Sequence, residues 1–141
     1  ALPTTPQAVF QDVASLLDAE YILPPNQQGD LTVLLVWNPE AVTPAPLKVF
    51  VHLVETTGSA VVSQDDQFPY DGVLSTTSWV PGEPIRDIYH IPLRNVPDGE
   101  YRLTVGWYDA ETGQRIMETS AGEDHSLLAH LMIADNSIEI R

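Results

Sequence analysis

Hydrophobic and polar side chains alternate along the segment from Gly99 to Asp109, which reads GEYRLTVGWYD. Its apolar residues occupy every second position: Tyr101, Leu103, Val105 and Trp107. Successive side chains of a strand point to opposite faces, so this pattern predicts a strand whose apolar face lies in a core. Turn signals flank it at Pro97-Asp98-Gly99 and Thr112-Gly113, and we expect Asp109 to Arg115 to form a solvated hairpin tip.

Short apolar segments recur along the chain, separated by isolated glycines and by prolines. Further strands are predicted over residues 13–22, 31–37, 47–55, 60–65, 85–93, 114–119, 126–133 and 137–140. Residues 31–37 (LTVLLVW) are apolar on both faces, which predicts a central strand. Thr57-Gly58 predicts a hairpin after residues 47–55.

The first of these segments has two interpretations. Val9, Val13, Leu16 and Leu17 have helical spacing, and Thr5-Pro6 provides an N-cap and a first-turn proline for such a helix. The prolines that follow at residues 24 and 25, and the strand-like segments around it, favour a strand.

These patterns predict an all-β protein of about eight or nine strands. A chain of 141 residues is expected to form one domain with a sufficient core. We therefore expect an antiparallel β-sandwich, immunoglobulin-like or jelly-roll-like, with Greek-key connections. It is expected to comprise residues 13–141, after an N-terminal extension of residues 1–12.

The composition restricts the partners of this domain. Twenty acidic and six basic residues give a formal net charge of −14, which disfavours binding to nucleic acid or anionic lipid. No apolar run approaches the ~20 residues that span a bilayer, so we expect no membrane insertion by this segment. Cysteine is absent, which excludes disulfides and thiolate chemistry. The chain starts with Ala1 rather than Met, as in an excised or processed domain or a cloning artefact.

The longest irregular segment, Asp66 to Gly82, contains three aromatic residues. One hypothesis is that this segment, together with Glu83, binds a glycan. Its rings would stack on sugars, and carboxylates would bind hydroxyls; the residues are Phe68, Tyr70, Asp71, Trp79 and Glu83. The alternative is that the rings cover one end of the core.

The carboxylates of Asp65, Asp66 and Asp71 suggest calcium, which prefers six to eight oxygen ligands. Their spacing lacks the regular alternation of a dedicated calcium loop, and solvated turn carboxylates are the alternative. We otherwise expect no cofactor.

Other residue types favour structural roles. Trp37 and Trp107 lie among apolar neighbours and are expected in the core. Zinc is disfavoured, although the first two of the four histidines are expected on different strands of one sheet: His52, His90, His125 and His130.

Glu83 and Asp87 cannot form a glycosidase pair through local geometry, because four positions of strand separate them by ~13 Å. Asp87 alternates with Ile85 and Tyr89, so it is expected to face inward and bind the backbone of a turn. No serine-hydrolase or nucleotide-binding motif is present.

From Val49 onward, the order of features resembles a known domain. The segments are Val49 to Gly58, Gln64-Asp65, Pro69 with Gly72, Trp79-Val80-Pro81-Gly82-Glu83, Asp87, Pro97 to Leu103, Val105 to Asp109, and Thr112 to Arg115. They resemble the extracytoplasmic C-terminal β-sandwich domain of bacterial multispanning membrane proteins that are similar to dolichyl-phosphate-mannose-type glycosyltransferases. The resemblance implies a fold and a location, on the cell-surface or periplasm-like side of a membrane, and no catalytic residue.

The expected function is therefore that of a non-catalytic extracytoplasmic accessory or interaction domain of a larger membrane-associated, glycosyltransferase-like protein. Its partner would be the remainder of that membrane protein, or a glycan. One alternative is a carbohydrate-binding module that uses residues 66–83, and another is a glycosidase-like enzyme domain.

Overall fold

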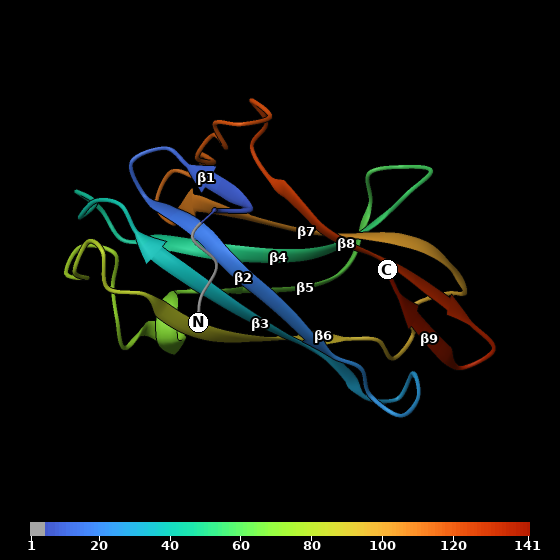
Figure 1. The fold of residues 1–141 in the computed structure, drawn as a ribbon. Helices are drawn as coiled ribbons and strands as arrows, with labels where there is room; N and C mark the ends of the chain where they lie inside the picture. Colours follow the sequence, from blue (N-terminus) through green and yellow to red (C-terminus); the bar gives the residue numbers. More distant parts are fainter. Residues whose placement is uncertain (1–4) are drawn as a thin grey trace.

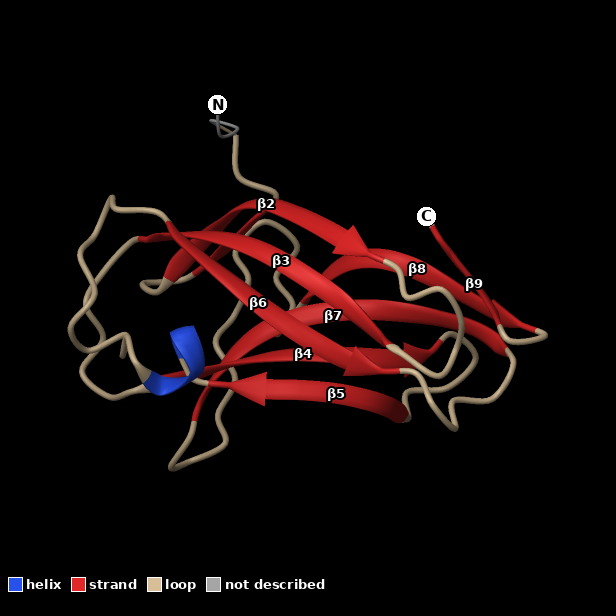
Figure 2. Ribbon diagram, turned by 90° about the horizontal axis from the view of Figure 1, so that it is seen from below, coloured by secondary structure: helices blue, strands red, loops and turns tan. Residues whose placement is uncertain are grey.

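The computed structural model describes residues 5–141, apart from the side chain of Asp71. Two antiparallel sheets pack face to face as a β-sandwich (Figures 1 and 2). The elements are β1 Ala8–Phe10, β2 Ala14–Ile22, β3 Asp30–Pro39, β4 Leu47–Glu55, β5 Val61–Gln67, the 3₁₀ helix η1 Pro69–Gly72, β6 Ile85–Pro92, β7 Gly99–Asp109, β8 Ser126–Ala134 and β9 Ser137–Ile140. Among the described residues, no helix is long and apolar enough to cross a bilayer.

Most strand predictions are confirmed, and the segment predicted over residues 13–22, which forms β2, is a strand rather than a helix. The predicted strand over residues 114–119 is wrong: that segment makes only isolated bridges, from Arg115 to Tyr108 and from Glu118 to both Phe10 and Glu123. In place of a regular ladder of backbone pairs, the side chains of Arg115 and Glu118 make contacts with distant residues. The Arg115 guanidinium lies 4.2 Å from the centroid of the Phe50 ring.

The first strand was not predicted, because three residues are too few to show a period. β1 pairs with the start of β2, and its residues Ala8 and Phe10 are buried in the core. The sandwich therefore includes part of the expected extension of residues 1–12, of which residues 1–4 lie outside the described residues.

The strand order distinguishes the two expected architectures. One sheet has the order β1-β2-β3-β6 and the other β5-β4-β7-β8-β9. Figure 2 shows β2, β3 and β6 in one layer and β4, β5 and β7 in the other. Immunoglobulin-type sandwiches place strands A, B and E in one sheet and C, F and G in the other. Here β2, β3 and β6 correspond to A, B and E, and β4, β7 and β8 to C, F and G, so the sandwich is immunoglobulin-like.

A second immunoglobulin-like feature lies at the start of β7. The Tyr101 hydroxyl donates a hydrogen bond to the Pro97 carbonyl, four residues upstream, at 2.6 Å. This contact has the form of a tyrosine corner, in which a tyrosine at the start of strand F is bonded to the backbone before it.

The core confirms the predicted alternation of β7. Its predicted core residues Tyr101, Leu103, Val105 and Trp107 are all buried. Trp107 packs edge-on against Trp37 and Trp79, at centroid distances of 5.1 and 5.5 Å. Residues 110–115 are exposed, as expected of a hairpin tip.

Side chains of β5 close one side of the sandwich. β5 and β6 are edge strands of different sheets, and every second side chain of β5 binds the backbone of β6. The contacts join Ser63 to the Pro92 carbonyl, Asp65 to the His90 amide and Gln67 to the Ile88 carbonyl, at 2.6, 2.8 and 2.7 Å. Three polar backbone groups of this β6 edge are therefore partnered, which hinders the addition of another strand.

Candidate functional site

The described residues line a groove of about 980 Å³. It lies on the outer face of β2, β3 and β6, and η1 and the end of β5 border it on the β6 side. We call it the sheet groove. Because its floor is a hydrogen-bonded sheet, the side chains that line it have fixed spacing.

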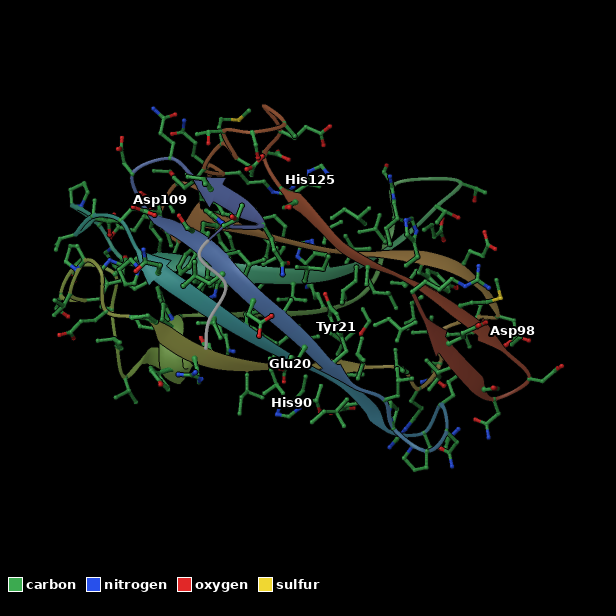
Figure 3. The ribbon with its side chains drawn as sticks, viewed as in Figure 1. Glu20, Tyr21, His90, Asp98, Asp109 and His125 are labelled. Carbon is green, nitrogen blue, oxygen red and sulfur yellow. The ribbon has the colours of Figure 1, made fainter. Side chains whose placement is uncertain are left out.

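Pairing between the strands places the lining residues in rows. Across β2, β3 and β6 the rows are Asp18–Val36–Arg86, Glu20–Leu34–Ile88 and Ile22–Thr32–His90. Acidic side chains thus lie along β2, apolar side chains along β3, and Arg86 and His90 along β6. Figure 3 shows the labelled Glu20 and His90 over this sheet.

The floor of the sheet groove is apolar and partly open to solvent. Val36 is 7% exposed, whereas Ile88 is 51% exposed in the middle of β6. The sequence contains a signal for this exposed apolar surface. β6 reads IRDIYHIP, and the neighbours of Ile88 on the same face are the polar residues Arg86 and His90. The apolar outer face of β3 was predicted, but its opening into a groove was not.

The structure separates the aromatic residues of the predicted glycan platform. Tyr70 of η1 is 46% exposed and lines the sheet groove. Phe68 is half-buried, and the Lys48 ammonium lies 5.0 Å from its ring centroid. Trp79 is 2% exposed, packs on Trp107, and donates a hydrogen bond to the Ala41 carbonyl at 2.7 Å.

Trp79 therefore offers no ring face to a ligand, which corrects the prediction that it forms part of a surface platform. The interpretation in which it covers the core describes its position instead. Glu83 is exposed in the turn before β6 and does not line the sheet groove. The side chain of Asp71 lies outside the described residues.

Two of the predicted calcium ligands point away from each other. Asp65 and Asp66 are consecutive residues of β5, so their side chains leave opposite faces of the strand. Asp65 accepts a hydrogen bond from the His90 amide, whereas Asp66 Oδ1 lies 3.0 Å from His52 Nε2. Among the described side chains, which do not include that of Asp71, no three His, Asp or Glu side chains converge as metal ligands.

The two histidines that were predicted to lie on one sheet, His52 and His90, lie on two different sheets. His52 belongs to β4 and His90 to β6, in different sheets. The prediction failed because the connection between β5 and β6 crosses from one sheet to the other. Burial lowers the pKa of His52, although the neighbouring Asp66 carboxylate opposes this shift.

Asp87 faces the interior, as predicted, and is 5% exposed. Its Oδ2 accepts hydrogen bonds from the Tyr70 amide at 3.2 Å and the Tyr89 hydroxyl at 3.1 Å, and the Trp37 indole donates to Tyr89 at 3.2 Å. Burial raises the pKa of Asp87, and these hydrogen bonds oppose that effect. The carboxylate connects η1, and with it Tyr70, to β6 beneath the sheet groove.

A comparison with protein-family models finds none that matches this chain, and a comparison with curated proteins also finds no match.

Proposed function

We propose that this chain is a non-catalytic extracytoplasmic accessory or interaction domain of a larger membrane-associated, glycosyltransferase-like protein. The observation that carries a binding role is the sheet groove, which combines an apolar floor with polar groups at both rims. Sites for small or extended ligands have this composition, in which apolar surface gives affinity and a few polar groups give orientation. The extracytoplasmic location is supported by the resemblance of residues 49–115 described above.

A binding role accounts for the positions of the acidic residues without catalysis. Glycosidases require two carboxyl groups that flank the scissile bond. Asp18 and Glu20 lie two positions apart on β2, side by side on one rim of the groove. Asp87 is buried and accepts hydrogen bonds from three donors, Tyr70, Ile88 and Tyr89.

Expression of the complete gene tests this proposal. An epitope tag inserted after Glu111, in the exposed hairpin tip, reports the position of the domain. We expect the tagged protein to sediment with membranes and the tag to be digested when protease is added to intact spheroplasts. Residues 1–141 with the same tag, expressed alone, form the matched control and should remain in the supernatant. Recovery of the complete protein in the soluble fraction would contradict the proposal.

A further inference from the structure

We infer that the sheet groove binds an uncharged oligosaccharide. This inference rests on the proposed function, in which the same groove is the binding surface of the domain. Three features of the groove carry it: the distribution of apolar and polar side chains, the charge around it, and the state of the neighbouring sheet edges.

The distribution of side chains suits an amphipathic ligand. A sugar ring presents apolar C–H faces and a rim of hydroxyl groups. Leu34, Val36 and Ile88 form an apolar floor, and Tyr70 adds an exposed aromatic ring at one side. Aromatic rings give such ligands rigid contact area with little loss of conformational freedom.

Polar side chains lie at both rims of this floor. Asp18 and Glu20 lie along β2, and Arg86 with His90 along β6, while Gln67 approaches from β5. Carboxylates accept hydrogen bonds, and guanidinium groups donate them in a fixed planar fork. A ligand that lies across the floor and carries hydroxyl groups on both sides can therefore use donors and acceptors at each rim.

The charge around the groove disfavours an anionic ligand. The protein carries a formal net charge of −14, and two carboxylates line one rim. A polyanion would be repelled by this field, whereas an uncharged sugar experiences no net Coulomb force. Arg86 alone does not make the groove positively charged, because two acidic side chains line its β2 rim.

The sheet edges disfavour an extended peptide over the groove floor. Peptides commonly bind sheets by adding a strand to a free edge. Three backbone groups of the β6 edge are already partnered by side chains of β5. Residues 18–22 of β2 pair with β3 on one side, and among the described residues no strand pairs with them on the opposite side. A peptide added there would lie beside the sheet, away from β6.

Amide chemical shifts distinguish these ligands. ¹⁵N-labelled protein is titrated with millimolar maltohexaose, cellohexaose, mannohexaose and chitohexaose, and separately with a decapeptide of alternating lysine and valine. We expect at least one oligosaccharide to shift amides of all three strands, within residues 18–20, 34–36 and 86–90. Arg86→Ala should weaken that binding about tenfold, the effect of losing a hydrogen bond to a charged group.

Arg94→Ala is the matched control, since Arg94 is an exposed arginine in the turn after β6 and outside the groove. It should leave the titration unchanged. Thermal melting of both variants confirms that they fold.

The outcomes separate this inference from the proposed function. If no oligosaccharide shifts these amides but the peptide does, the ligand class is wrong and the groove remains a binding surface. If neither shifts them, both the inference and the binding role of the groove are overturned. Oligosaccharide shifts confined to other strands, or equal affinity of the Arg86→Ala variant and the parent, overturn the inference alone.

Discussion

The outer faces of the two sheets both carry apolar side chains, but only one of them is covered. On the five-stranded sheet, Phe50 of β4 points outward and is nevertheless 1% exposed. On the four-stranded sheet, Ile88 of β6 also points outward and is 51% exposed. The cause lies in the connections: in the loop of residues 110–125, Arg115 lies over the Phe50 ring and the Asp124 carbonyl lies beside Gly106, whereas no described segment covers Ile88 to the same extent. Figure 3 labels Asp109 and His125 at the two ends of the covering loop.

The covered face is closed by specific contacts. Gly106 of β7 lies opposite Phe50, and a Cβ atom there would overlap the Phe50 ring. Arg115 stacks on this ring and lies 3.4 Å from Asp124 across the loop. An arginine stacked on an aromatic ring gains a cation–π interaction. The difference between the faces shows that this chain can bury an outward apolar side chain, and that it leaves the sheet groove open.

Phe50→Ala should produce the largest change in stability. Removing a buried aromatic ring costs about 3 kcal/mol, through lost burial and a residual cavity. Urea unfolding measures this loss. A change no greater than that of Ile88→Ala would show that the two faces do not differ as described.

Gly106→Ala should destabilise the protein by about 2 kcal/mol, because the added methyl group displaces the Phe50 ring. Gly58→Ala is the control, since the atom near its added methyl group belongs to the Glu55 side chain. Combining Gly106→Ala with Phe50→Leu should recover part of the loss. Equal melting temperatures for the two glycine variants would contradict the tight fit between Gly106 and Phe50.

Glu118 anchors the covering loop and makes it sensitive to acid. Burial acts to raise the pKa of Glu118, but hydrogen bonds from Ser120, Val9 and Ala121 outweigh it and lower the pKa to about 2. Because the folded-state pKa is lowered, this carboxylate stabilises the protein above its ordinary pKa. The contribution is lost as the pH falls towards about 2.

We therefore expect Glu118→Gln to cost about 1.5 kcal/mol at neutral pH, the effect of weakening hydrogen bonds to a charged group. The cost should decrease in acid. Melting temperature against pH, compared with Glu111→Gln at the exposed hairpin tip, checks this expectation. A pH-independent difference between Glu118→Gln and the parent would exclude the proposed ionisation.

Ile88→Ser should have the smallest effect on stability, within about 0.5 kcal/mol, as expected of an exposed substitution. Leu127→Ser on β8 is the matched control, since Leu127 is 49% exposed on the other sheet. Only Ile88→Ser should weaken the oligosaccharide titration. If Leu127→Ser weakens it equally, the open face of β6 is not the relevant surface.

The sequence alone determined those features that depend on alternation within one strand. Tyr101, Leu103, Val105 and Trp107 were assigned to the core correctly, and Asp87 was predicted to face inward. In each case, the apolar neighbours at every second position identify the buried face, because the pleat of a strand is local. The covering role of Trp79 was also among the alternatives that the sequence suggested.

The tertiary structure decided what lies against each outer face. The pattern LTVLLVW shows that both faces of β3 are apolar, but not that Leu34 and Val36 form the floor of a groove. The turn at Thr112-Gly113 suggested a return strand over residues 114–119, although Glu118 instead accepts a hydrogen bond from the Val9 amide, 109 positions away. Sheet pairing and the covering of a face depend on contacts between distant segments. A local period carries no information about them, so they follow only from the folded arrangement of the whole chain.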